Sequence, residues 1–389
     1  MLNQQLQAVT DKDRIKYHIV GLSVSIKLPG QEIQNFVSGH TSQSKIKKIT
    51  PNTFFQIGSI GKTFTATLIM QLVEQNKLHL NDKLGKFLPR YPKWKDVTIR
   101  NLLNHTSGIY NFTHPHSYDV MLRKNPYKKY SMIDLANMAY QYPNHFKPGQ
   151  GVNYSNTDYI LLGLVIEKVT HKPMQLIFDD YLHKYNLMHT FYTPYDLFSN
   201  SIKKNFAHGY DEEGTFGVNK DATFFTAASA HTAGSMISTP NDLVKWLIQL
   251  FNEKIISHHS LETMMTLISD KTAKPLDKNL CMQKKEFIKN PMTEIGSGLG
   301  MGLIYFRQYG FVWAHAGGVP NGYESFYSYN PCKDIYVAVI YNKKPKKQLI
   351  FTEIEKDIFK VILKSSSVQQ AISSYQQGHP LPSYCQCEM

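Results

Sequence analysis

The sequence predicts a two-lobed protein of the mixed α/β class, of the α+β type, in which an antiparallel sheet is flanked by helices. Three observations predict this fold. The chain has 389 residues, more than one ordinary hydrophobic core accommodates. Short strand-like runs between residues 298 and 341 are separated by turns of Gly, Pro and Asn, as in an antiparallel meander. Residues from about 98 to 210 are mostly helical in pattern, which predicts a helical lobe.

The composition excludes several classes of protein. With 42% hydrophobic and 19% charged residues, the chain is globular rather than disordered or fibrous. No apolar run approaches the roughly 18 residues needed to cross a bilayer, so we expect no integral membrane segment. Residues 1–17 lack the apolar core of a secretory signal. Either a leader has been removed or the protein stays inside the cell.

Basic residues outnumber acidic residues by 43 to 30, which gives a formal charge of +13. Such an excess favours anionic surroundings. The charges are nevertheless scattered over short runs, such as residues 45–48 and 343–347, with no aromatic-interleaved basic stripe and no nucleic-acid motif. We therefore expect these runs to be solvated faces, and we expect no nucleic-acid partner.

The N-terminal part of the chain predicts a hairpin followed by a helix. Residues 18–27 read as a buried strand and residues 33–39 as its hairpin partner. The helix is expected to begin at Ser59 and to end near Lys77. It should bury one face, because apolar residues recur every fourth position, at Ile60, Phe64, Leu68 and Leu72.

The C-terminal part predicts two further helices and a tail. A helix over residues 241–251 follows Thr239 as N-cap and Pro240 at its first position. An amphipathic helix over residues 350–363 should lie across the sheet, and the polar residues from 364 onward should form a loosely attached tail. The first two cysteines have no zinc-site spacing, whereas the two in the tail, with His379 upstream, could bind a metal or oxidise, although we expect the tail to be free and mobile. The four cysteines are Cys281, Cys332, Cys385 and Cys387.

Ser59 and Lys62 form the first candidate site. Three positions apart at a helix start, they are neighbours on one turn, so the lysine amine can reach the serine oxygen. A serine hydroxyl needs a base to take its proton, and burial lowers the pKa of a lysine enough to make it one. The positive end of the helix would face the group that Ser59 attacks. Alternatively, Ser59 only caps the helix and Lys62 is solvated.

Tyr154 and Asn156 form the second candidate site, in a loop that the Pro and Gly residues of 147–151 impose before a buried helix. Two apart on extended backbone, the two side chains can point to one side. A nearby lysine ammonium would lower the pKa of the Tyr154 phenol, which suits a general base. Asn156 both donates and accepts, which suits a peptide-like substrate. Alternatively, Tyr154 packs at the helix entry and Asn156 caps the helix.

His315, Gly317 and Gly318 form the third candidate site, at the end of a strand over residues 311–316. Paired glycines let backbone approach a ligand closely. The amides of Gly318 and Ser59 could form an oxyanion hole. His315 could offer a donor or a partial positive charge to an anionic group, although a histidine at a strand end is often structural.

Together the three sites resemble the three motifs of the penicillin-recognising serine hydrolases, in the same order along the chain. The resemblance covers roughly residues 15–363. It is closest to the branch that contains class C β-lactamases, D-alanyl-D-alanine carboxypeptidases, D-aminopeptidases and related esterases. Supporting stretches lie at residues 102–108, 148–149, 233–239 and 298–300.

The resemblance implies how the lobes are built and what the site residues do. One α/β lobe would combine residues 1–75 with 211–363, a mainly helical lobe would span residues 76–210, and residues 364–389 would be a polar C-terminal tail. Ser59 would be the nucleophile, Lys62 and Tyr154 would share proton transfer with the tyrosine as base, and the Ser59 and Gly318 amides would bind the oxyanion. Substrate would be held by Asn156, His315 and Gly317.

The resemblance further implies acyl-enzyme hydrolysis of a small molecule or peptide, such as a cell-wall peptide, without metal or organic cofactor. It favours a periplasmic or secreted location and leaves the oligomeric state open. Many members carry Lys-Thr-Gly where this chain has His315, Ala316 and Gly317. One lost charge-assisted hydrogen bond is worth about 1.5–3 kcal/mol, so β-lactams should bind poorly. We expect a D-amino-acid peptidase, carboxypeptidase or esterase; the alternatives are a β-lactamase and a penicillin-binding sensor or scaffold that acylates without efficient turnover.

Overall fold

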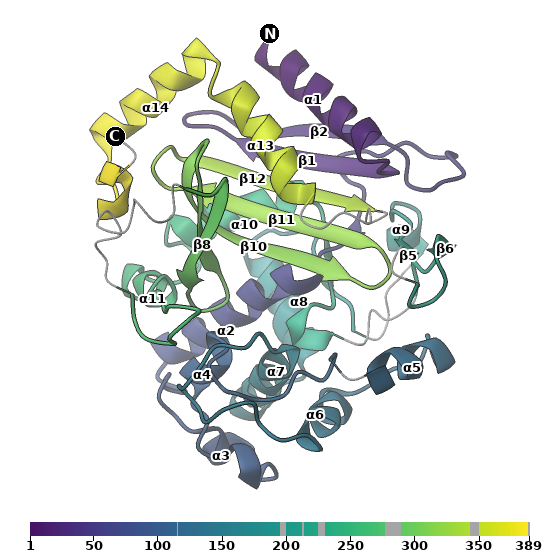
Figure 1. Ribbon diagram of the computed structural model, residues 1–389, viewed down its shortest axis with the longest axis vertical. Helices are drawn as coiled ribbons and strands as arrows, with labels where there is room; N and C mark the ends of the chain where they lie inside the picture. Colours follow the sequence, from purple (N-terminus) through teal and green to yellow (C-terminus); the bar gives the residue numbers. More distant parts are fainter. Residues whose placement is uncertain are drawn as a thin grey trace.

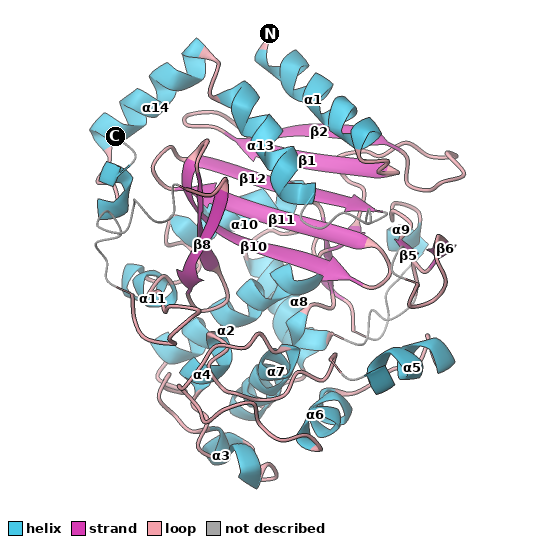
Figure 2. Cartoon of the chain, in the orientation of Figure 1, coloured by secondary structure: helices cyan, strands magenta, loops and turns pink. Residues whose placement is uncertain are grey.

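A seven-stranded antiparallel sheet forms the centre of the computed structural model, which describes residues 1–114, 116–194, 200–211, 214–224, 230–276, 289–342 and 350–387. The strand order is β2-β1-β12-β11-β10-β9-β8 (Figure 2). Strands from the two ends of the chain are therefore neighbours, and Gly21 of β1 lies opposite Asn342 of β12. The strands are β1 (Gly21–Lys27), β2 (Gln34–Gly39), β8 (Met292–Ser297), β9 (Gly302–Phe306), β10 (Gly310–Val319), β11 (Tyr323–Asn330) and β12 (Ile335–Asn342).

Helices cover both faces of this sheet. Helices α1 (Leu2–Lys16) and α13 (Ile350–Ile362) lie on one face, and α10 (Pro240–Phe251) lies on the other (Figure 1). Alternate residues of a strand point to opposite faces, so Val337 and Val339 join the core under α13 while Ala338 and Ile340 join the core under α10. All eight residues of β12 are buried for this reason.

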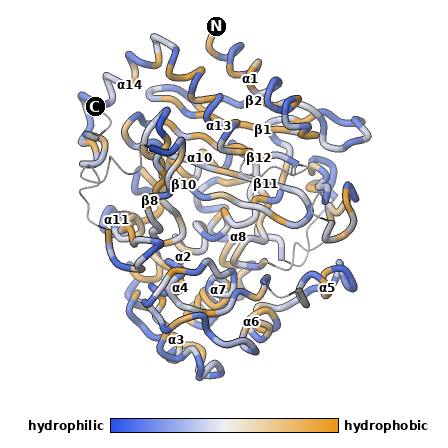
Figure 3. The backbone as a smooth tube through the Cα atoms, viewed as in Figure 1, coloured by the Kyte–Doolittle hydropathy of each residue, from blue (hydrophilic) through white to orange (hydrophobic). Residues whose placement is uncertain are grey.

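A mainly helical region lies beside the sheet, below it in Figure 1. Its central helix α7 (Asn156–Thr170) is buried over most of its length. Hydrophobic and hydrophilic residues alternate along α13 and other outer helices, as Figure 3 shows, because only one side of each faces a core. Helices α3 (Leu84–Phe87), α4 (Ile99–Leu103), α6 (Met132–Tyr140) and α8 (Met174–Lys184) contact α7, and α5 (His116–Lys124) lies farther out in Figure 1.

The remaining elements are short, apart from α2 (Gly61–Glu74), which runs between the sheet and the helical region. No helix in the described ranges is long and apolar enough to cross a membrane. The short strands form two small sheets, β3-β7-β4 and β5-β6. They are β3 (Phe55–Gln56), β4 (Phe191–Tyr192), β5 (Tyr210–Asp211), β6 (Lys220–Asp221) and β7 (Met236–Ser238), with α9 (Asn200–Lys203) and α11 (His258–Met264) between and after them.

The C-terminal segment is bound to the sheet, so the prediction of a loosely attached tail is wrong. Residues Ser366–Gly378 form α14, and a disulfide joins Cys385 to Cys332. The indole Nε1 of Trp313 on β10 donates to the Tyr384 hydroxyl at 3.0 Å. Of the two outcomes expected for the tail cysteines, metal binding or oxidation, Cys385 shows oxidation. Cys281 and residues 343–347 lie outside the described residues.

Other element boundaries also differ from the prediction. The polar residues at the N-terminus form α1, which buries Leu6 and Val9. The helix expected from Ser59 begins instead at Gly61 and ends at Glu74. The run expected as a strand from residue 298 begins at Gly302, because residues 298–301 turn between β8 and β9.

A buried carboxyl group lies between α1 and α13. Asp13 is fully buried and faces Asp357, whose carboxylate pairs with Lys12 at 3.2 Å. Burial, with a smaller contribution from the Asp357 charge, raises the pKa of Asp13 to about 7. The unfolded chain holds this proton only below about pH 4. Between these values the folded state binds the extra proton, so its stability decreases as pH rises towards 7.

We therefore expect Asp13→Asn to remove this pH dependence. At pH 8 the variant should be more stable than the unmodified protein, by on the order of 2 kcal/mol, because an amide needs no proton to stay neutral. Urea denaturation of both proteins at pH 5 and pH 8 measures the effect. Equal changes in unfolding free energy between the two pH values would contradict it.

Candidate active site

Ser59 lies in a tight turn, Gly58–Ile60, that immediately precedes α2. Gly58 has φ +50°, and a Cβ there would come within 2.9 Å of the Gly318 nitrogen. A Cβ on Gly317 would lie 2.0 Å from the Ile57 carbonyl oxygen. The glycines thus let β10 pack directly on the serine turn. We expected both glycines to face a ligand; Gly317 instead contacts this turn, whereas the Cβ position of Gly318 has open space around it.

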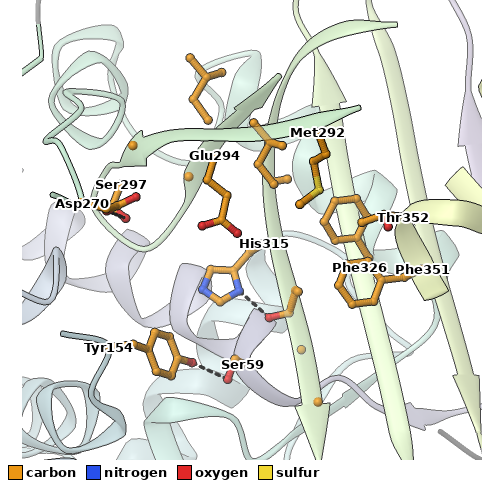
Figure 4. Close-up of a pocket in the computed structure, with 18 of the residues that line it drawn as sticks. Ser59, Tyr154, Asp270, Met292, Glu294, Ser297, His315, Phe326, Phe351 and Thr352 are labelled. Carbon is orange, nitrogen blue, oxygen red and sulfur yellow. Dashed lines mark hydrogen bonds between the residues drawn. The ribbon is translucent and has the colours of Figure 1, made fainter. Parts of the chain in front are cut away.

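Side chains from distant segments converge on the Ser59 oxygen. The Tyr154 hydroxyl donates to Ser59 Oγ at 2.6 Å (Figure 4), and Lys62 Nζ lies 3.0 Å from the same oxygen. Lys62 Nζ also donates to Asn156 Oδ1 at 2.7 Å and to the Ala233 carbonyl at 2.8 Å. The predicted first and second sites are therefore one hydrogen-bonded cluster, to which the residue 233 backbone also contributes.

Lys62 is fully buried, and burial lowers its pKa well below the usual 10.5, against a smaller opposing effect of the Asp158 charge. A neutral amine has two N–H donors and one lone pair. The Asn156 and Ala233 oxygens can accept only from N–H groups, so both donors are engaged. The lone pair is then left for the Ser59 hydroxyl, which makes Lys62 a suitable proton acceptor.

The pKa of Tyr154 shifts in the direction opposite to the prediction. Desolvation raises the pKa of its hydroxyl above 10, with the Ser59 hydrogen bond opposing the shift. Solvent reaches the side chain, which is 40% exposed, and moderates the increase without reversing its direction. The predicted decrease required a lysine ammonium, but burial of Lys62 disfavours that charged form, and desolvation dominates the shift of Tyr154. In the resting site Tyr154 is thus a proton donor.

Asn156 is not the helix cap that the alternative interpretation required. Ser155 occupies the N-cap position of α7, and Asn156 is the first helical residue. Its Oδ1 accepts from Lys62, and its Nδ2 donates to Thr113 Oγ1 at 3.3 Å. The amide is therefore oriented from both ends, with its position set by the start of α7.

A supporting layer lies behind Tyr154. The sequence indicates residues 102–108 only through their resemblance to the family, and it predicts no role for His105 or Asp158. The His105 ring packs on the Tyr154 ring, with centroids 4.6 Å apart. His105 Nδ1 accepts from the Ser155 N–H at 3.2 Å and lies 3.3 Å from Asp158 Oδ2. Asp158 is fully buried and accepts from Ser107 Oγ at 2.6 Å. The available signal was an acidic residue inside the apolar run of residues 157–168.

His315 lies on β10, which continues past it to Val319. Its Nδ1 donates to the Ala316 carbonyl at 2.6 Å. Burial, with the Lys62 charge as a smaller cause, lowers the pKa of His315 to about 4. The imidazole is therefore neutral near pH 7, and it offers no full charge to a substrate carboxylate.

Two cavities open beside Ser59, and Ser59 and Gly318 line both of them. The first, of about 370 Å³, is lined by Tyr154, His315 and apolar side chains of β8 to β11. The second, of about 410 Å³, is lined by polar groups that include Asn156. A reacting group at Ser59 could therefore carry substituents in two directions. Within the described ranges, no group of three or more His, Cys, Asp or Glu side chains could hold a metal ion.

Comparison with known proteins identifies similar chains. The sequence model described as "Beta-lactamase" matches residues 4–354. Protein flp of Staphylococcus aureus (strain MW2) is 30% identical over 284 residues, 70% of this chain and 54% of that protein. Teichoic acid D-alanine hydrolase of Staphylococcus aureus (strain MRSA252) is 30% identical over 231 residues, 56% of this chain and 51% of that protein. The chain thus spans about half the length of these curated relatives.

The fold is also similar to solved structures. D-amino acid amidase from Ochrobactrum anthropi SV3, complexed with L-phenylalanine amide, superposes with a TM-score of 0.77 and 22% sequence identity. The match covers 93% of this chain and 99% of the amidase. At this identity the likeness concerns the fold, and it extends over nearly the whole of both chains.

Proposed function

This chain belongs to the β-lactamase family of serine hydrolases, and we propose that it hydrolyses amides or esters of D-amino acids through an acyl-enzyme on Ser59. One observation carries the proposal: Lys62 Nζ and the Tyr154 hydroxyl both reach the Ser59 oxygen, at 3.0 and 2.6 Å. The names of a relative, teichoic acid D-alanine hydrolase, and of a structural neighbour, D-amino acid amidase, support the D-amino-acid part.

Acylation begins with attack of Ser59 Oγ on the substrate carbonyl carbon. The hydroxyl proton passes to the neutral Lys62 amine, and the carbonyl electron pair moves onto the oxygen, which the Ser59 and Gly318 amides stabilise. Collapse breaks the bond to the leaving nitrogen or oxygen, which takes the Tyr154 proton. The Lys62 ammonium, 4.8 Å from the centre of the Tyr154 ring, then returns a proton to the tyrosine oxygen. Asn156 orients Lys62 and the substrate amide.

Deacylation uses the same groups with water as the nucleophile. Water attacks the ester carbon and gives a proton to the Lys62 amine, and collapse then breaks the bond from the carbonyl carbon to Ser59 Oγ. The proton returns from Lys62 to the serine oxygen, and the carboxylic acid leaves. The enzyme regains its resting protonation state, with Lys62 neutral and Tyr154 protonated.

Efficient β-lactam hydrolysis is not part of the proposal. β-Lactam substrates carry a carboxylate. The third site offers this carboxylate only the neutral His315 and the methyl side chain of Ala316, neither of which is a cationic partner. The proposed substrates need no carboxylate partner at this position. The Cys332–Cys385 disulfide favours an oxidising compartment, in keeping with a secreted or periplasmic hydrolase.

The test combines intact-mass measurement with turnover. A fluorophosphonate should add once, at Ser59, p-nitrophenyl acetate should be hydrolysed, and nitrocefin should be hydrolysed only weakly. The p-nitroanilide of D-alanine should exceed its L-enantiomer in kcat/KM by at least about tenfold, because only one enantiomer places its carbonyl correctly between Ser59 and Gly318.

The two parts of the proposal fail differently. Absence of a fluorophosphonate adduct under conditions where the protein is folded would refute the serine chemistry. Labelling at Ser59 with equal turnover of both enantiomers would leave the serine chemistry in place and refute the D-amino-acid specificity.

A further inference from the structure

The wall of the first cavity is acidic in a basic protein. The chain carries a formal charge of +13, yet this wall includes the carboxylates of Asp270, Glu294 and Glu324 and no lysine or arginine. The histidine of the wall, His315, is neutral near pH 7 because its pKa is lowered to about 4. Among the residues that the structure describes, nothing on this wall balances the negative charge.

The three carboxylates are not equivalent. Glu324 is buried and accepts from the Tyr341 hydroxyl. Asp270 accepts from Ser297 Oγ at 2.7 Å. The Glu294 carboxylate has no hydrogen-bond or ion-pair partner among the described residues, and Figure 4 shows it directed into the cavity, towards His315 and above Ser59. Glu294 is thus the acidic group of this wall whose side chain is not already engaged by a hydrogen bond in the described part of the chain.

The geometry of strand β8 directs the Glu294 side chain into the first cavity. Glu294 lies on the edge strand β8, opposite Ile304 of β9, and the register of the two strands shifts between Glu294 and Gly296. Such a bulge bends a strand and redirects a side chain, and bulges are common beside active sites. The Glu294 side chain is exposed to solvent, and its partial desolvation, with the Asp270 charge as a smaller cause, raises its pKa. A substrate cation would relieve the repulsion between these two carboxylates.

We propose that Glu294 is a specificity-determining residue that selects substrates carrying a cationic group, an ammonium, in the cavity beside Ser59. The proposal rests on the serine chemistry proposed above and narrows its substrate class to aminoacyl amides and esters with a free α-ammonium or a side-chain ammonium. The apolar side chains Met292, Ile304 and Phe326 contact the carbon skeleton, and the carboxylate meets the charge. Substrates with an anionic group in this cavity are repelled.

The test uses p-nitroanilides matched in shape. D-lysine and D-norleucine p-nitroanilide differ by a side-chain ammonium, and D-norleucine p-nitroanilide differs from its N-acetyl derivative by the α-ammonium. We expect the cationic member of at least one pair to have about a tenfold higher kcat/KM, expressed mainly in KM. The preference should shrink in 1 M NaCl, because solvent-exposed charge pairs are screened by salt.

Glu294→Gln should abolish the preference, bringing the ratio of kcat/KM within each pair close to one. The matched control is Glu32→Gln, which makes the same charge change at an exposed position outside both cavities and should leave the ratio unchanged. A wild-type ratio near one for both pairs, or a preference that survives Glu294→Gln, would overturn the proposal. These outcomes require measurable turnover, so they are distinct from a failure of the serine chemistry itself, in which no p-nitroanilide is hydrolysed and no fluorophosphonate adds.

Discussion

Ser59→Ala is expected to abolish turnover of amides and esters and to prevent covalent labelling by a fluorophosphonate. Without the serine oxygen no acyl-enzyme forms, and loss of a nucleophile of this kind lowers kcat by roughly 10⁶-fold. Intact-mass measurement of the labelled protein and kcat with p-nitrophenyl acetate check the two parts of the expectation.

The same substitution should leave the fold intact. The Ser59 side chain contacts Lys62 and Tyr154, and after truncation Lys62 keeps its bonds to Asn156 and Ala233. A change in unfolding free energy of about 1 kcal/mol or less is expected. Ser44→Ala, at an exposed position, is the matched control and should keep full activity. Normal labelling of the Ser59→Ala protein would show that another residue is the nucleophile.

Lys62→Met is expected to lower kcat/KM by about 10²- to 10⁴-fold, the usual contribution of a positioned general base. Methionine fills a similar volume in this fully buried position but has no lone pair that can take the serine proton. The fluorophosphonate should still add to Ser59, at a much lower rate, because the nucleophile itself remains. A time course of the adduct by mass spectrometry measures this rate.

The pH profile separates a base from a merely structural lysine. Activity of the unmodified enzyme requires the neutral amine, so kcat/KM should rise with pH through the pKa of Lys62, which burial places well below 10.5. The residual activity of Lys62→Met should lack this rise. An identical profile in both proteins would exclude Lys62 as the base.

Local patterns in the sequence predicted most of the fold that surrounds the site. The hairpin of residues 18–39, the meander and the Thr239-capped helix α10 follow from alternation and from capping chemistry that act over a few residues. Helix α1 was missed because its buried side includes Thr10 and Asp13, which carry no apolar periodicity.

The contacts missed at the sequence level are those made between distant segments. Cys332 and Cys385 are 53 positions apart, and no local signal distinguishes this pair from the other pairings of four cysteines. The direction of the Tyr154 pKa shift likewise could not be predicted from the sequence. Proximity to Lys62 was inferred correctly, but its effect on the tyrosine depends on how completely the lysine is desolvated, which only the packed structure provides.

The contact of Gly58 with Gly318 has a consequence for how such a site can diversify. The gap between the Ser59 turn and the Gly318 amide is set by the direct packing of Gly58 on Gly318, where no side chain intervenes. Side chains along the cavity walls can therefore be exchanged without altering this gap. The main-chain contact that supports catalysis is therefore distinct from the wall side chains that select the substrate. New substrates can be accommodated by replacing wall side chains while this contact is retained.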